Sequence, residues 1–181
     1  MTTLLLVGIA AAAPALASRT WPAGSGSSSH GAIAARPALD LAIVAQLNRV
    51  RASYGLRRLR VNGALADAAA VHSREMTSTG LFQHESSDGS AFWKRVERYY
   101  GSVGYQRWDV GETLLWSSPD TTASTAVSDW LASPPHRKIL LDARWFEVGV
   151  SAVHDTSAPG AFDGVEGTIV TADFGARTRR S

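Results

Sequence analysis

Three side chains with acid, base or metal-ligand chemistry stand at intervals along the middle of the chain: His84, Glu112 and His136. Two neutral imidazoles and one carboxylate form a ligand set that suits Zn²⁺ with a fourth position left open. Zinc in such a site lowers the pKa of a bound water to about 7 and can hydrolyse an ester, amide or glycosidic bond. Glu85 is the nearest spare carboxylate and the candidate general base.

The same residues have two interpretations without catalysis, and the sequence leaves these and the catalytic zinc site open. The groups can hydrogen-bond one another and hold loops together, or they can bind a metal weakly without catalysis. The zinc-protease motif His-Glu-x-x-His is excluded, because Asp88 stands where the second histidine should be. A Gly-x-Ser-x-Gly elbow and a phosphate-binding loop are also missing, so serine acyl transfer and nucleotide binding have no support.

Composition describes one ordinary globular domain of 181 residues, with 45% hydrophobic and 19% charged residues. There is no cysteine, which excludes disulfides, cysteine-ligated zinc, a thiol nucleophile and a lipidated cysteine anchor. The formal charge is only +2, and the one tight basic cluster (Arg57, Arg58 and Arg60) has no interleaved aromatic residues. We therefore expect no nucleic-acid partner, and we expect a monomer.

The first residues predict export. Leu4 to Ala13 is a continuous apolar run, and Ala15-Leu16-Ala17 offers a small-x-small cleavage pattern, so residues 1–17 read as a signal peptide cleaved after Ala17. Because an apolar run of this length is too short to span a bilayer, the mature chain is expected to have no transmembrane segment. Residues 18–36 are rich in Gly and Ser and predict a flexible linker.

Helices precede strands in the rest of the chain. Apolar spacing predicts helices from Pro37 to the stop at Gly55 and over residues 64–79, the second capped by Asn62 and ended by Gly80. Two shorter helices follow, the first begun at Ser90 and the second capped by Ser118 or Asp120. Residues 81–89 and 101–109 read as loops, and residues 145–153 and 165–174 as an antiparallel hairpin. This order favours an α+β domain.

Two side chains on these helices are expected in the core. His72 shares an apolar helical stripe with Leu65, Ala69 and Met76, so it is predicted to be a core histidine with a satisfied ring hydrogen bond. Trp130 lies on the apolar face of the fourth helix and is predicted to be buried.

Seven short motifs, in order, resemble one known family. They are Leu47-Asn48-x-x-Arg51, Ala69-x-x-His72-Ser73-x-x-Met76, Phe82-x-His84, Gly111-Glu112, Trp130-x-x-Ser133-x-x-His136-Arg137, Phe146-x-Val148-Gly149-Val150 and Asp173-Phe174-Gly175. Their order is similar to that of the bacterial branch of the CAP superfamily (SCP domain), which includes cysteine-rich secretory proteins, antigen 5 and plant pathogenesis-related proteins.

The resemblance implies an α-β-α sandwich with a central antiparallel sheet over residues 37–176, followed by a disordered tail at 177–181. It also implies a cleft that holds His84 and Glu112, with His136 as the third member. Three functions follow as expectations. The favoured one is a secreted binding module that holds a lipid, peptide or cell-wall ligand and a divalent metal such as zinc. The alternatives are a metal-dependent hydrolase of peptides or cell-wall polymers and a structural surface-interaction domain.

Overall fold

The structure is a computed structural model that describes residues 31–179. It has five strands: β1 (Ile33–Ala35), β2 (Arg60–Val61), β3 (Tyr105–Ser117), β4 (Glu147–Asp155) and β5 (Gly167–Arg179). The helices are α1 (Pro37–Ser53), α2 (Gly63–Thr79), α3 (Phe92–Tyr99), α4 (Ala123–Ala132) and α5 (Pro134–Leu140), with a 3-10 turn η1 (Gly160–Phe162). Within the described residues, no helix is both long enough and apolar enough to cross a membrane.

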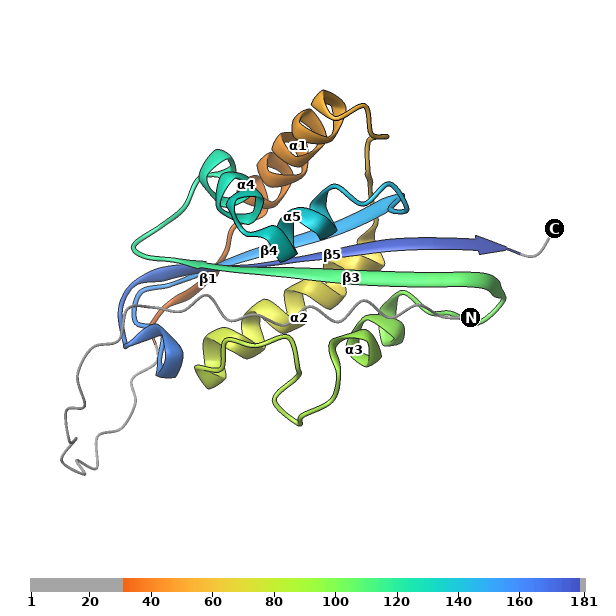
Figure 1. Cartoon of the computed structure of the whole chain (residues 1–181). Helices are drawn as coiled ribbons and strands as arrows, with labels where there is room; N and C mark the ends of the chain where they lie inside the picture. The colour runs from red at the N-terminus through yellow and green to blue at the C-terminus, as the bar shows by residue number, and fades with distance from the viewer. Residues whose placement is uncertain (1–30, 180–181) are drawn as a thin grey trace.

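One sheet forms the middle layer of the molecule. Its strands run in the order β1-β4-β5-β3, all antiparallel, and the short β2 pairs in parallel with β4. Helices α1, α4 and α5 cover one face of this sheet, and α2 and α3 cover the other (Figure 1). The predicted α-β-α sandwich with a central antiparallel sheet is confirmed.

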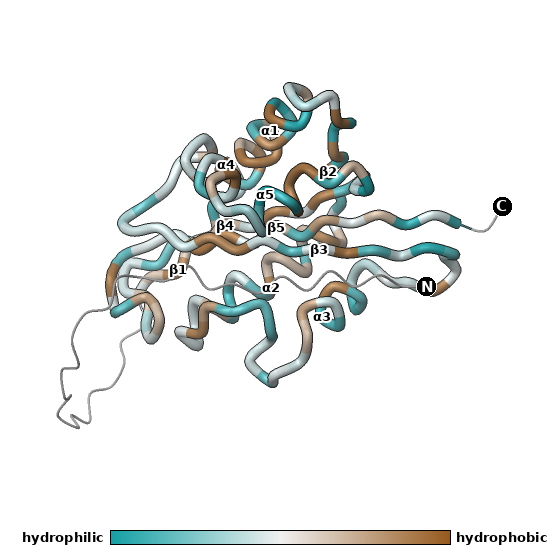
Figure 2. Tube along the Cα trace, in the orientation of Figure 1, coloured by the Kyte–Doolittle hydropathy of each residue, from teal (hydrophilic) through white to brown (hydrophobic). Residues whose placement is uncertain are grey.

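Each face of the sheet has its own hydrophobic core (Figure 2). The core under α1, α4 and α5 includes Ile43, Leu47, Trp130, Leu140, Val148 and Phe174. The opposite face packs Leu65, Val96 and Tyr100 in one cluster and Met76, Leu114 and Phe162 in another. Gly149 lets α2 lie directly on β4, since a Cβ atom there would sit 2.0 Å from the backbone nitrogen of Ala66.

The ends of the long helices follow the prediction. The Asn62 side chain accepts hydrogen bonds from the backbone N–H groups of Ala64 and Leu65, and Gly80 ends α2 in the left-handed conformation. The predicted caps of the shorter helices, Ser90 and Ser118 or Asp120, are wrong. Ala91 precedes α3 without a side-chain hydrogen bond, and Thr122 caps α4 by accepting from the N–H of Thr125.

The predicted loop at 101–109 is wrong, because β3 begins at Tyr105 and is one of the two longest strands. Helices cover both faces of the sheet, so residues 109–114 are all buried and show no alternation of polar and apolar residues. The alternation that would have revealed this strand in the sequence is therefore missing.

The ordered domain is also longer at both ends than predicted. β1 falls within the predicted linker and pairs with β4 at His154. β5 continues to Arg179, into the predicted disordered tail, and there Arg177 stacks on Tyr100 and Tyr105. The predicted signal peptide at 1–17 and the first part of the predicted linker lie outside the described residues.

We expect Trp130→Ala to lower the free energy of unfolding by about 3–5 kcal/mol, because the truncation leaves a cavity in the larger core. Trp130 is 1% exposed, and its indole N–H donates to the carbonyl of Leu114 at 2.8 Å. Urea unfolding of both proteins measures the difference. Val103→Ala, at a position that is 94% exposed, is the matched control and should change little. An effect of Trp130→Ala no larger than that of the control would contradict this assignment.

Candidate functional site

Two acidic side chains lie opposite each other on the neighbouring strands β3 and β5. Glu112 of β3 and Asp173 of β5 are direct partners in the strand register, and Asp173 is in turn opposite Gly149 of β4. Paired residues share a face of the sheet, and for this row it is the face under α2, since Gly149 contacts Ala66. Glu112 is 2% exposed and Asp173 is 0% exposed, so both carboxyl groups need partners supplied by the protein.

Glu112 has a partner on each carboxylate oxygen. His84, from the loop between α2 and α3, places Nδ1 2.8 Å from Oε1 of Glu112. Arg95, from α3, donates from Nη2 to Oε2 of Glu112. Arg95 also donates to the His84 carbonyl at 3.3 Å and to the Ser86 hydroxyl at 3.1 Å. One carboxylate thus ties together a strand, a loop and a helix.

The two acidic groups have opposite protonation preferences. Burial alone would raise the pKa of Glu112, but the His84 hydrogen bond and the positive charge of Arg95 outweigh it and lower that pKa. The pKa of Asp173 is raised well above its ordinary value by burial and by the negative charge of Glu112. With Asp173 protonated and Glu112 ionised, this pair holds one proton and one negative charge, and neither oxygen of Asp173 has a hydrogen-bond partner among the described residues.

His72 is the core histidine that the sequence predicted. It is 1% exposed, with Nε2 2.8 Å from the carbonyl of Gln83 and Nδ1 3.3 Å from Oε2 of Glu75. Burial lowers its pKa, although the negative charge of Glu112 acts the other way. His72 therefore fastens the loop after α2 to that helix, and its Nε2 lies 4.0 Å from Oε1 of Glu112.

His136 lies on α5, on the other side of the sheet, and is half-buried. Burial lowers its pKa, and the positive charge that His84 can carry lowers it further, which brings the two imidazoles into one electrostatic neighbourhood. No hydrogen bond joins His136 to Glu112 or His84 among the described residues. The structure thus brings His84 and Glu112 into contact and leaves His136 as a neighbour of His84.

Glu85 does not join the cluster. Its side chain is exposed, and of the described contacts only its backbone carbonyl takes part, accepting from Gln83 at 3.4 Å. The candidate general base next to the two imidazoles therefore has no position within this hydrogen-bonded group.

The structure does not arrange His84, Glu112 and His136 as three direct ligands of one zinc ion. Across residues 31–179, no group of three or more histidine, aspartate or glutamate side chains is arranged to hold a metal ion. As a direct ligand, Glu112 would have to leave Arg95. It is better placed behind His84, where a carboxylate on Nδ1 orients the ring and leaves Nε2 for an outside partner. Zinc binding itself stays a prediction.

Two members of the cluster were missed in the sequence. Arg95 stands three residues after Phe92 and next to Val96, on the side of α3 that faces the sheet, where a charged residue needs a buried partner. Asp173 is a single acidic residue in the otherwise uncharged run Ile169–Phe174 of a buried strand. A charged residue within an apolar pattern was the available signal in both cases.

Comparison with known proteins agrees with this fold. The chain is 33% identical over 103 residues to the uncharacterized membrane protein YlbC of Bacillus subtilis strain 168, covering 57% of this chain and 28% of that protein. It is 28% identical over 149 residues to the uncharacterized protein YkwD of the same strain, covering 82% and 53%. An extracellular protein containing a SCP domain from Bacillus anthracis str. Ames superposes with a TM-score of 0.60 at 26% identity, covering 77% and 41%.

This chain therefore spans only about a quarter to a half of the length of these curated relatives. Residues 44–174 match the sequence model of the family described as CAP, the cysteine-rich secretory protein family. That match includes β3, β4, the whole His84–Glu112–Arg95 cluster and most of β5. The chain belongs to the CAP, or cysteine-rich secretory protein, family.

Proposed function

We propose that this chain is an exported, non-enzymatic binding domain that holds a small apolar, lipid, peptide or cell-wall ligand. The observation that carries the proposal is the state of Glu112, whose two oxygens both accept from protein groups, His84 and Arg95. Despite burial, the two hydrogen bonds lower the pKa of Glu112, and a carboxylate with a lowered pKa is a poor general base. His84, with 20% of its side chain exposed, is then the group of this cluster that meets a ligand.

Export is part of the proposal. It is supported by the apolar run and cleavage pattern in residues 1–17 and by the Bacillus anthracis relative, whose protein is described as extracellular. In an exported domain without cysteine, the two hydrophobic cores and the buried ion pair must provide all of the stability.

A turnover assay separates this function from a metal-dependent hydrolase. We expect no hydrolysis of peptide or cell-wall substrates, with excess zinc or with a chelator, because the carboxylate in contact with His84 is the one that Arg95 also holds. Hydrolysis that a chelator abolishes and zinc restores would contradict the proposal. If capture of cell-wall material survives both His84→Ala and Glu112→Ala, the chain is better described as a surface-interaction domain that does not use this cluster.

A second candidate is a weak divalent-metal site on His84 and His136. It is favoured by the direction of the His84 ring, whose Nδ1 faces Glu112, and by the lowered pKa of His136, which keeps that imidazole neutral at physiological pH. Neutral imidazole is the form that binds a metal. In this arrangement Glu112 orients His84 and does not bind the ion.

For that candidate, calorimetric titration with Zn²⁺ should show binding at about pH 7.5 that weakens at least about tenfold near pH 5, since protons compete for the imidazoles. His136→Ala should abolish the binding. His154→Ala is the matched control, because that ring contacts Thr168 and Glu166 and not the cluster. Equal affinity at the two pH values would rule out these histidines as ligands.

Asp173→Asn should raise the free energy of unfolding at neutral pH. The folded parent keeps the proton on Asp173, whereas the unfolded chain releases it above the ordinary pKa of 3.8. The proton-linked stability of the parent is therefore complete below that pH and falls by about 1.4 kcal/mol for each unit up to the folded pKa. Asparagine removes this loss, because it stays neutral in both the folded and the unfolded chain.

Urea unfolding at pH 5 and pH 7 tests this, and the advantage of Asp173→Asn should grow between the two. The exposed α2 residue Asp67 supplies the control, since Asp67→Asn should track the parent at both pH values. An advantage that does not change with pH would mean that Asp173 is ionised in the folded chain.

A further inference from the structure

The edge of the sheet formed by β4 is covered only at its two ends. β1 pairs with residues 153–155, and Arg36 just after it donates its backbone N–H to the carbonyl of Ala152 at 3.0 Å. β2 pairs with residues 147–148, and Asn62 just after it donates to the carbonyl of Val148 at 2.9 Å. The chain then leaves the sheet on both sides, as α1 and as α2. A gap therefore remains in the covering of this edge, and Val150 lies at its centre.

The backbone of Val150 faces this gap. Val148 and Ala152 direct their backbone polar groups away from β5, and residues two apart in a strand point the same way. Across residues 31–179, no backbone or side-chain group on this edge forms a hydrogen bond with Val150. Val150 is only 5% exposed, and a strand edge with a free N–H and C=O pair is a template for another amide.

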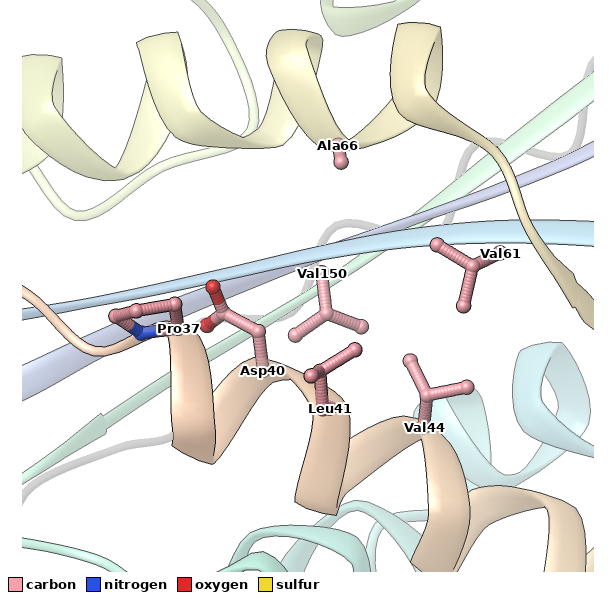
Figure 3. Close-up of a pocket in the computed structure, with 7 residues that line it drawn as sticks. All are labelled: Pro37, Asp40, Leu41, Val44, Val61, Ala66 and Val150. Atoms are coloured by element: carbon pink, nitrogen blue, oxygen red, sulfur yellow. The ribbon is translucent and has the colours of Figure 1, made fainter.

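An apolar pocket lies over this gap (Figure 3). It has a volume of about 240 Å³ and is lined by Pro37, Leu41, Val44, Val61, Ala66 and Val150, together with Asp40. Leu41 and Val61 are 64% and 57% exposed, which makes them two of the most exposed large apolar residues described. Pockets for drug-sized ligands start at about 300 Å³, so this one suits a smaller group, such as one amino-acid residue.

Asp40 adds a negative charge at this place. Its Oδ1 accepts the backbone N–H of Ala152 at 2.6 Å, and its other oxygen has no partner among the described hydrogen bonds. No described cation forms an ion pair with Asp40, so its charge is not balanced. Burial raises the pKa of Asp40 to about 6, which leaves the group ionised at pH 7.5. Charge complementarity therefore calls for a ligand with a positive group beside its apolar part.

We propose that this gap binds the amino terminus of a peptide whose first residue is apolar. The terminal ammonium pairs with Asp40, the first side chain fills the pocket, and the first carbonyl accepts the N–H of Val150. Ala152 and Val150 are about 7 Å apart along the strand, a span that one residue and its hydrogen bonds cover. A chain end fits better than an internal segment, because Arg36 and Asn62 close the edge on either side.

This inference rests on the proposal that the chain is a binding module, and it supplies a class of ligand and a second site for it. The probe is leucine methylamide, which carries the ammonium, the apolar side chain and the carbonyl. N-acetyl-leucine methylamide is the matched control without the charge. Amide NMR spectra of the full chain, recorded during titration with each at about pH 7.5, report binding at Val150 directly.

We expect leucine methylamide to shift the Val150 amide signal saturably and to bind at least about tenfold more tightly than the acetylated probe. Asp40→Asn keeps an acceptor for Ala152 and should remove that preference. Leu41→Ser should weaken both probes, whereas Val103→Ser, at a still more exposed site away from the pocket (94% against 64%), should not. Both variants change surface residues, so folding should be preserved.

Equal binding of the two probes would overturn the preference for a chain terminus. Absence of a saturable shift at Val150 up to about 10 mM probe would overturn the site itself. Shifts confined to His84 and His136 would also overturn this site, but they would leave the binding-module proposal standing. Zinc-dependent turnover, together with a saturable shift of the Val150 amide signal, would overturn the binding-module proposal and leave this site standing.

Discussion

The buried charge of Glu112 is the constraint on which the rest of this structure depends. A carboxylate on a strand that is covered by helices is expensive to bury unless protein donors replace the lost water. Arg95 and His84, which are 17 and 28 residues from Glu112 in the sequence, provide those donors. α3 and the loop before it therefore have to lie against β3, and this closes the second hydrophobic core around Tyr100 and Val96.

Two of the titratable groups next to Glu112 are neutral and add no further buried charge. Asp173 holds its proton, and burial favours neutral His72, so one ion pair, Arg95 with Glu112, remains as the principal fixed charge pair in the interior. The cluster is almost neutral as a whole, which is the arrangement that costs least in a low dielectric. Of this cluster, His84 has 20% of its side chain exposed, whereas the side chain of Glu112 is fully buried.

The two edges of the sheet have different characters. β3 forms the edge near the two imidazoles. The opposite edge, along β4, has an apolar gap, where the backbone N–H and C=O of Val150 have no partner and the carboxylate of Asp40 has no cation beside it, among the described residues. The two Bacillus subtilis relatives and the Bacillus anthracis protein are longer than this chain, so in these three the matching unit is one part of a larger protein.

Local features were readable in the sequence because their causes are local. Asn62 and Gly80 bound α2 through contacts within a few residues, and the stripe that holds Leu65, His72 and Met76 is a property of one helix. The ordered motifs were also sufficient to identify the family, and hence the three-layer fold and the meeting of His84 with Glu112.

Tertiary structure alone decided the rest. β3 has no polar alternation because helices bury both of its faces, and neither the pairing of Arg95 with Glu112 nor the protonation of Asp173 follows from spacing. Such pairings depend on which distant segments meet in the interior, and burial there sets the cost that makes them necessary.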